Sequence, residues 1–274
     1  MGRDYFGKNA DALKRKRLFL FDMDGTIYQE ERLFEGTLPL LEQIRNTGGR
    51  YVFITNNSSR SVADYVAKLN RLGIPADEDD FFTSSQATIL YIRKHYPDAK
   101  VYCQGTRSLV RELRKGGIQV TEEIEDGIGA IVVGFDTELT SAKLRRTCEL
   151  LNRDIPFLAT NPDLVCPVSF GYVPDCGSMC MMLENATKRK PIYLGKPEPT
   201  MIHIVMEKLG MRREDTVVVG DRLYTDIASG LSAGVSTICV LTGEATVEDI
   251  QKERDRPTYT FQSVKEILDS LQDD

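Results

Sequence analysis

The chain has 274 residues, of which 41% are hydrophobic and 28% charged, and its net charge is −6 at pH 7. These values predict a soluble globular protein of one or two domains and exclude collagen, coiled coils and low-complexity disorder. The acidic balance argues against a protein that works by neutralising nucleic-acid phosphates. No run of 18 apolar residues occurs, so we expect no membrane-spanning helix.

The segment before the first apolar run is polar and ends in Lys14-Arg15-Lys16-Arg17. Because it lacks an apolar core followed by small residues, we expect a solvated flank and no signal peptide. Six cysteines are scattered without a CxxC pair, and the chain has two histidines, His95 and His203. A structural zinc site is therefore not expected, and the scattered cysteines fit a cytoplasmic protein.

Two common catalytic arrangements are missing from the sequence. There is neither the G-x-S-x-G elbow of a serine hydrolase nor the G-x-x-x-x-G-K-[ST] loop of a P-loop nucleotidase. We expect His95 at an exposed helix end and His203 on an amphipathic helix. Imidazole is therefore not the expected catalytic base.

Short apolar runs alternate with amphipathic stretches along the chain. Runs rich in β-branched and aromatic residues suit strands that are buried on both faces of a parallel sheet. The expected strands are Leu18–Phe21, Tyr51–Ile54, Ala130–Phe135, Pro156–Ala159, Ile192–Leu194, Thr216–Val219 and Thr237–Leu241. The expected helices are Leu38–Asn46, Ser61–Leu72, Ala87–His95, Arg107–Lys115, Ser141–Asn152, Thr200–Leu209, Thr225–Leu231 and Val264–Leu271. This alternation predicts an α/β fold with right-handed crossovers.

Four of the expected strands end in residues that can carry chemistry. These residues are Asp22-Met23-Asp24-Gly25-Thr26, Thr55-Asn56-Asn57-Ser58, Gly195-Lys196-Pro197 and Gly220-Asp221 with Asp226. Because ligands bind outside the carboxyl ends of parallel strands, we expect all four stretches to meet at one rim of one sheet. The interval from Asp22 to Thr55 suits one strand–helix–strand unit. The interval from Thr55 to Lys196 is several times longer, so about a hundred residues should form a second unit between them.

The acidic residues point to a metal-assisted reaction of a phosphate. Asp22 and Asp24 lie two apart at a strand end, so their side chains point roughly the same way and repel unless a cation intervenes. Asp221 and Asp226 add two more carboxylates, and carboxylates without histidine or thiolate suit Mg²⁺. A hydroxyl at Thr55 and a positive charge at Lys196 suit the oxygens of a phosphoryl group.

A carboxylate can itself be the nucleophile in phosphoryl transfer. Asp22 could attack phosphorus and form an aspartyl-phosphate. A second acid must then protonate the leaving alkoxide and later deprotonate the hydrolytic water. Asp24 is placed for that work.

Taken together, the motifs resemble all four motifs of the haloacid dehalogenase superfamily, phosphatase type. The acid at Asp24 is the one that the phosphatases have and the dehalogenases lack. Four stretches further resemble the NagD-like, or p-nitrophenyl phosphatase-like, branch: Ile54-Thr55-Asn56-Asn57-Ser58-Ser59-Arg60, Val132-Val133-Gly134-Phe135-Asp136, Thr160-Asn161-Pro162-Asp163 and Gly195-Lys196-Pro197. The resemblance covers nearly the whole chain.

The resemblance implies a role for each core motif residue. Asp22 would be the nucleophile and a Mg²⁺ ligand, and Asp24 the acid/base with its backbone carbonyl on the metal. Asp221 would complete the protein ligands, and Asp226 would support them. The phosphoryl group and nearby substrate would be bound by Thr55, Asn56, Asn57 and Lys196.

The resemblance also implies the domain organisation. A Rossmann-like parallel sheet core with helices on both faces would comprise residues 1–83 and 182–274, with an inserted α/β cap domain at residues 84–181. The cap loop from Thr160 to Ser178 would set specificity, with Cys166 as a small, weakly polar group at the position that reads the substrate. Many members have Pro-Gly-x-Gly near the end of this loop, whereas this chain has Pro174-Asp175-Cys176-Gly177.

The expected activity is hydrolysis of a small phosphorylated metabolite, such as a sugar or glycerol phosphate, with no nucleic-acid or membrane partner. Relatives often dimerise, so a homodimer is a candidate assembly. A phosphotransferase or mutase that uses the same intermediate is an alternative. A receiver-like phosphorylated signalling module is another, although receivers are about half this size and have no cap.

Overall fold

The computed structural model describes residues 2–168 and 170–272. They form two compact units. The first unit comprises the described residues of Met1–Ile54, Val66–Phe82 and Lys196–Asp274, and the second those of Thr55–Tyr65 and Thr83–Gly195. Among the described helices, none is both long and apolar enough to cross a membrane.

The first unit is built on a six-stranded sheet with the order β15-β14-β13-β1-β4-β5. Its strands are β1 (Leu18–Phe21), β4 (Arg50–Thr55), β5 (Phe81–Thr83), β13 (Thr216–Gly220), β14 (Ser236–Val240) and β15 (Tyr259–Phe261). Strand β1 pairs in parallel with β13 and β4, and β14 pairs in parallel with β13 and β15. All four residues of β1 are buried, as expected for a central strand covered on both faces.

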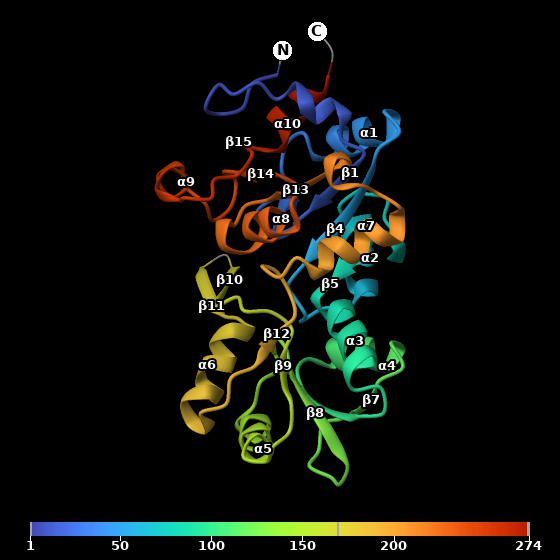
Figure 1. Cartoon of the computed structure of the whole chain (residues 1–274), viewed down its shortest axis with the longest axis vertical. Helices are drawn as coiled ribbons and strands as arrows, with labels where there is room; N and C mark the ends of the chain where they lie inside the picture. The colour runs from blue at the N-terminus through green and yellow to red at the C-terminus, as the bar shows by residue number, and fades with distance from the viewer. Residues whose placement is uncertain (1, 169, 273–274) are drawn as a thin grey trace. The chain divides into compact units, whose positions relative to one another are not determined.

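Helices cover both faces of this first sheet (Figure 1). They are α1 (Thr37–Asn46), α2 (Val62–Arg71), α7 (Thr200–Leu209), α8 (Ala228–Ala233), α9 (Val247–Lys252) and α10 (Val264–Leu271). Helix α1 packs against α10, and α7 packs against α8. Right-handed crossovers from β1 to β4 and from β13 to β14 run in opposite directions along the sheet, so α1 and α8 lie on opposite faces.

Short elements complete the first unit. They are the 3-10 helices Asp11–Arg15, Glu78–Asp80 and Arg213–Asp215, the hairpin strands β2 (Tyr28–Gln29) and β3 (Arg32–Leu33), and the π-helix η4 (Leu223–Ile227). The π-helix leads directly into α8, so the predicted helix Thr225–Leu231 falls on two consecutive elements.

The second unit has its own parallel sheet of five strands with the order β12-β9-β8-β6-β7. Its elements are β6 (Lys100–Gln104), β7 (Gln119–Thr121), β8 (Ile128–Val133), β9 (Phe157–Ala159), β12 (Ile192–Tyr193), α3 (Ser84–His95), α4 (Arg107–Lys115), α5 (Ser141–Leu151) and α6 (Cys176–Thr187). An antiparallel hairpin, β10 (Val165–Val168) and β11 (Gly171–Pro174), precedes α6. Helices α3 and α4 lie on one face of the sheet, and α5 and α6 on the other (Figure 1).

Alternating side chains of the second sheet fill two separate apolar cores. Val132 of β8 packs into the core on the α3 and α4 side. Its neighbours Ile131 and Val133 pack into the core on the α5 and α6 side. This alternation is the two-residue period of a strand that is buried on both faces.

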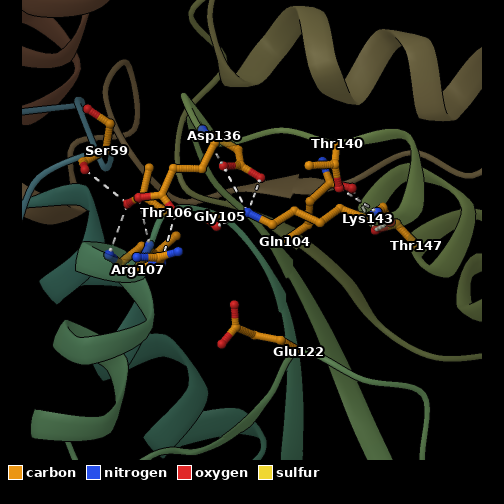
Figure 2. Close-up of polar contacts among 12 residues, drawn as sticks. Ser59, Gln104, Gly105, Thr106, Arg107, Glu122, Asp136, Thr140, Lys143 and Thr147 are labelled. Atoms are coloured by element: carbon orange, nitrogen blue, oxygen red, sulfur yellow. Dashed lines mark hydrogen bonds and ion pairs between the residues drawn. The ribbon is translucent and has the colours of Figure 1, made fainter.

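Polar contacts brace the carboxyl ends of β6 and β8 in the second unit (Figure 2). The ammonium of Lys143 donates to both carboxylate oxygens of Asp136, at 3.2 and 2.9 Å, and to the Gly105 carbonyl at 2.8 Å. Thr147 donates to the Gln104 carboxamide oxygen at 2.6 Å. The Asp136 side chain is fully buried, so its charge is balanced by Lys143 inside the unit.

The α/β class with a parallel sheet core, helices on both faces and an inserted α/β unit is confirmed. The predicted strands and helices all fall on observed elements. One expectation is wrong: Ile192–Tyr193 is an edge strand of the second sheet, so the four chemical stretches do not all follow strands of one sheet. A run of three apolar residues indicates a strand but carries no information about which sheet it joins.

Several elements lie outside the predicted set, chiefly β5, β6, β7, β15, the two hairpins and α9. Strand β6 reads Lys-Val-Tyr-Cys-Gln, so polar ends interrupt its apolar run. The second unit extends to Gly195 because β12 pairs with β9. The division into a catalytic core of residues 1–83 and 182–274 and a cap domain of residues 84–181 stays a prediction.

Candidate active site

Three carboxylates meet at the carboxyl end of the first sheet. Asp22 follows β1, and its backbone N–H donates to the Val219 carbonyl of β13 at 2.8 Å. Asp221 follows β13, and Asp226 lies on the π-helix η4. One carboxylate oxygen from each acid lies within 4.8 Å of the others. Asp221 and Asp226 are 3% and 1% exposed, so two of the three acids are shielded from water.

The ammonium of Lys196 joins two of these acids. It donates to Asp22 Oδ1 at 2.6 Å and to Asp226 Oδ1 at 2.5 Å, and it lies 3.3 Å from the Ile54 carbonyl of β4. Lys196 is only 2% exposed. Burial alone would lower the pKa of Lys196, but the Asp22 and Asp226 carboxylates outweigh burial and raise it. The side chain is therefore a permanent buried cation.

The remaining negative charge favours a divalent cation. Burial raises the pKa of Asp22 well above its ordinary value; Lys196 opposes that effect, and Asp226 and Asp221 add to it. Burial, followed by the Asp226 carboxylate, raises the pKa of Asp221 to about 6. When all three carboxylates are ionised, the cluster carries two net negative charges beside the Lys196 ammonium. An all-oxygen donor set with that excess fits a hard divalent cation.

The Asp221 carboxylate is fixed by groups from two loops. The Thr26 hydroxyl donates to its Oδ1 at 3.3 Å, and the Glu244 N–H donates to its Oδ2 at 2.9 Å. A Cβ at Gly243 would overlap this carboxylate, and a Cβ at Gly25 would lie 2.6 Å from Oδ2. Gly25 also has φ +87°, a conformation that favours glycine. Both glycines are therefore required for the loops to close around Asp221.

Gly243 and Glu244 were missed by sequence reasoning. They follow the carboxyl end of β14, one strand beyond β13 in the sheet. The available signal was their position after the predicted strand Thr237–Leu241. A single glycine and a backbone N–H carry no recognisable motif, so only the tertiary structure identifies them.

Asp24 lies in the tight turn after β1. The Gly25 N–H donates to the Tyr28 carbonyl at 2.9 Å and closes this turn. The Asp24 side chain is 42% exposed, in contrast to the buried Asp221 and Asp226. Its carboxylate is thus accessible to solvent.

Thr55, Asn56 and Asn57 begin the second unit, directly after the last first-unit residue of β4. The Thr55 hydroxyl accepts from the Asn57 N–H at 3.1 Å, and the Asn57 side-chain oxygen accepts from the Ser59 N–H at 2.9 Å. The Asn56 carbonyl accepts from the Ser84 hydroxyl at 2.7 Å. These contacts order the turn, and its role toward a substrate stays a prediction.

Residues of the branch motifs meet inside the second unit. Ser58 and Thr160 share a hydrogen bond of 2.8 Å between their hydroxyls. The Phe135 N–H donates to the same Ser58 hydroxyl at 2.9 Å. These contacts tie the turn after β4 to the carboxyl ends of β8 and β9, which gives the motif residues a structural role.

Cys166 lies in β10, where it is partly buried and packs against the core on the α5 and α6 side. Its proposed contact with substrate stays a prediction. The departure from Pro-Gly-x-Gly has a structural reason. Asp175, at the first glycine position, has φ −98° and caps α6, and its Oδ1 accepts from the Asn161 carboxamide at 3.1 Å, whereas a Cβ at Gly177 would overlap the Pro162 carbonyl. Only the second glycine position therefore needs glycine here.

Neither histidine is buried in the structure. His95 is the last residue of α3, and His203 lies on α7; both are exposed. This placement agrees with the predicted helix positions.

Family models match both ends of the chain. A haloacid dehalogenase-like hydrolase model matches residues 19–119, and a second HAD-hydrolase-like model matches residues 193–267. The acid sugar phosphatase of Staphylococcus saprophyticus is 32% identical over 260 residues, which are 95% of this chain and 100% of that protein. The chain belongs to the haloacid dehalogenase-like hydrolases.

Solved structures agree with this assignment. The 4-nitrophenylphosphatase of Thermotoga maritima has a TM-score of 0.90 and 37% identity, over 95% of this chain and 99% of that one. The glycerol phosphate phosphatase Rv1692 of Mycobacterium tuberculosis, solved in complex with magnesium, has a TM-score of 0.88 and 31% identity, over 96% and 79%. The predicted NagD-like, p-nitrophenyl phosphatase-like branch is confirmed, and this hydrolase is a phosphatase.

In this phosphatase, Gly243→Ala tests the loop that surrounds Asp221. The added Cβ must displace the carboxylate, so we expect kcat/KM to fall about a hundredfold, because a misplacement of about 1 Å can cost that much. Release of 4-nitrophenolate from 4-nitrophenyl phosphate measures the loss. Gly48→Ala is the matched control: Gly48 has φ +75° with open space around it, so we expect a lower melting temperature with unchanged kcat/KM. Wild-type activity in Gly243→Ala would contradict the described geometry.

Proposed function

We propose that the protein is a magnesium-dependent phosphatase that hydrolyses a small phosphomonoester through an aspartyl-phosphate on Asp22. The observation that carries the proposal is the Lys196 ammonium, which holds Asp22 Oδ1 at 2.6 Å beside two further buried carboxylates. The relatives named for acid sugar, 4-nitrophenyl and glycerol phosphates support a sugar, glycerol or similar phosphate as substrate. No observation favours a phosphotransferase, a mutase or a receiver-like module over this activity.

The residues present fit a magnesium site. Asp22 and Asp221 would be side-chain ligands, and the Asp24 backbone carbonyl would be a third ligand. Asp226 would support them, because Lys196 and the Arg222 N–H, at 3.2 Å, engage its two oxygens. The magnesium reported for one structural relative supports this choice of metal. A bound Mg²⁺ would draw negative charge off the phosphoryl oxygens.

The first half of the reaction transfers the phosphoryl group to Asp22. An Asp22 oxygen attacks phosphorus as the bond between phosphorus and the ester oxygen breaks. Asp24 gives its proton to the departing ester oxygen, so the alcohol leaves neutral. Lys196 keeps the Asp22 carboxylate in place and offsets the phosphoryl charge.

The second half returns the enzyme to its starting state. Asp24, now a carboxylate, takes a proton from water while the water oxygen attacks phosphorus. The bond between Asp22 and phosphorus breaks, inorganic phosphate leaves and both acids regain their original states.

The remaining predicted residues belong to the proposal as substrate contacts. Thr55, Asn56 and Asn57 would bind the phosphoryl group and the adjacent substrate, and Cys166 would line the specificity loop. The inserted domain, proposed at residues 84–181, would act as the cap that shields the reaction from water. A cytoplasmic location, expected from the sequence, and a homodimer, a candidate assembly from the family resemblance, also stay part of the proposal.

Asp22→Asn is expected to lower phosphate release at least about a thousandfold, because a carboxamide is a poor nucleophile and loses the charge that pairs with Lys196. Release of inorganic phosphate from 4-nitrophenyl and glycerol phosphates measures it, with far-UV circular dichroism to verify folding. Asp154→Asn is the matched control, since that side chain is fully exposed. Retained activity in Asp22→Asn alongside a folded protein would disprove the assignment.

Magnesium affinity is expected to weaken in acid. Because the raised pKa of Asp221 is about 6, a proton occupies this acid below that pH and must leave when the metal binds. The apparent dissociation constant should rise about tenfold per pH unit below about pH 6 for each proton displaced. Calorimetric titration with MgCl₂ from about pH 7.5 to about pH 5 measures it. A dissociation constant that stays unchanged over that range would contradict the described burial of Asp221.

A further inference from the structure

A second set of interacting side chains surrounds Asp24 within the first unit. Tyr28 lies four residues after Asp24, in β2, and is fully buried. Its hydroxyl donates to Asp24 Oδ2 at 3.1 Å. The backbones of the two residues also form a bridge. Tyr28 therefore reaches the Asp24 carboxylate from a rigid position.

Lys68 approaches the same carboxylate from helix α2. Its ammonium lies 3.8 Å from Asp24 Oδ1 and 3.7 Å from the centroid of the Tyr28 ring. The Lys68 side chain is only 6% exposed, whereas that of Asp24 is 42% exposed. The cation is thus held inside the protein, and the carboxylate that it faces reaches solvent.

This burial is costly unless the charge is balanced. An ammonium withdrawn from water loses its hydration, and its neighbours must replace that hydration. The face of the Tyr28 ring attracts the cation, and the Asp24 carboxylate supplies an opposite charge. As a result, one Asp24 oxygen is hydrogen-bonded to a phenol and the other faces a fixed positive charge.

We propose that Tyr28 and Lys68 are positioning residues for the proton transfer that Asp24 carries out. The inference rests on the proposed function. When the ester bond to phosphorus breaks, the Asp24 proton moves to the departing oxygen, and negative charge develops on the Asp24 carboxylate. That charge forms beside a donor and a cation that are already in place, which stabilises it without reorganisation. Tyr28 also restricts the rotation of a half-exposed carboxylate and so fixes the oxygen that gives the proton.

A purely structural role for Lys68 predicts a different result. Substrates whose leaving groups differ in their need for a proton distinguish the positioning role from the structural one. Nitrophenolate leaves without a proton because its nitro group spreads the negative charge. Phenolate resembles the tyrosine side chain, with a pKa of about 10, and needs the proton more. A defect in Asp24 positioning should therefore harm phenyl phosphate more than 4-nitrophenyl phosphate, whereas a general structural defect should harm both equally.

The test compares kcat/KM for these two substrates in Tyr28→Phe, Lys68→Met and Lys68→Arg. For each substrate, kcat/KM reports only the steps up to loss of the phenol, so slow hydrolysis of the aspartyl-phosphate does not affect it. We expect Tyr28→Phe and Lys68→Met to lower kcat/KM for phenyl phosphate about tenfold more than for 4-nitrophenyl phosphate. Lys68→Arg retains a cation over the ring, so its loss of kcat/KM for phenyl phosphate should be much closer to its loss for 4-nitrophenyl phosphate than in Lys68→Met.

Two further variants make the outcome decisive. Lys208→Met is the matched control, because Lys208 forms an exposed ion pair with Asp79 at 2.8 Å and should change neither value. Asp24→Asn should show the same leaving-group dependence, and more strongly. If it does not, the acid role of Asp24 in the proposed function fails.

If Asp24→Asn shows the dependence and Tyr28→Phe shows equal losses or none, the inference alone is overturned. The same result in Lys68→Met overturns the part assigned to Lys68. Tyr28→Phe retains the buried ring, so it tests the proposal even if Lys68→Met does not fold.

Discussion

The buried Lys196 ammonium between Asp22 and Asp226 is the interaction on which the rest of the site depends. At 2% exposure it has little access to water, so the two carboxylates must stabilise it. Asp221 adds a third carboxylate and leaves the cluster with an excess of negative charge. The same charges that make the cluster costly in an apolar core make it suited to a divalent cation and a phosphoryl group.

The parts of the site that follow apolar strands could be predicted from the sequence. Asp22 and Asp221 come directly after β1 and β13, which are buried and adjacent, so the carboxyl ends of these strands had to bring the acids together. The prediction that Lys196 lies beside the acids is correct, but its reason, that Lys196 follows a strand of the same sheet, is wrong. Lys196 follows β12, which belongs to the second sheet, and yet its ammonium reaches Asp22.

Other parts of the site depend on tertiary placement that no local pattern encodes. Gly243 and the Glu244 N–H hold Asp221, but neither forms a motif. Lys68 lies in a helix with an ordinary amphipathic sequence, where a lysine is usually solvated. Its burial depends on a tertiary contact with the Tyr28 ring, which the helix sequence does not indicate. The same limit applies to β6 and β15, whose short or interrupted apolar runs gain their strand character from neighbouring strands.

The most direct test of the account is to find the residue that carries the phosphoryl group during turnover. The enzyme would be mixed with Mg²⁺ and 4-nitrophenyl phosphate, quenched in acid and digested, and the phosphorylated peptide identified by mass spectrometry. The account predicts phosphate on Asp22, absent when Mg²⁺ is withheld. Phosphate on another residue, or turnover of the substrate with no phosphorylated enzyme under single-turnover conditions, would contradict it.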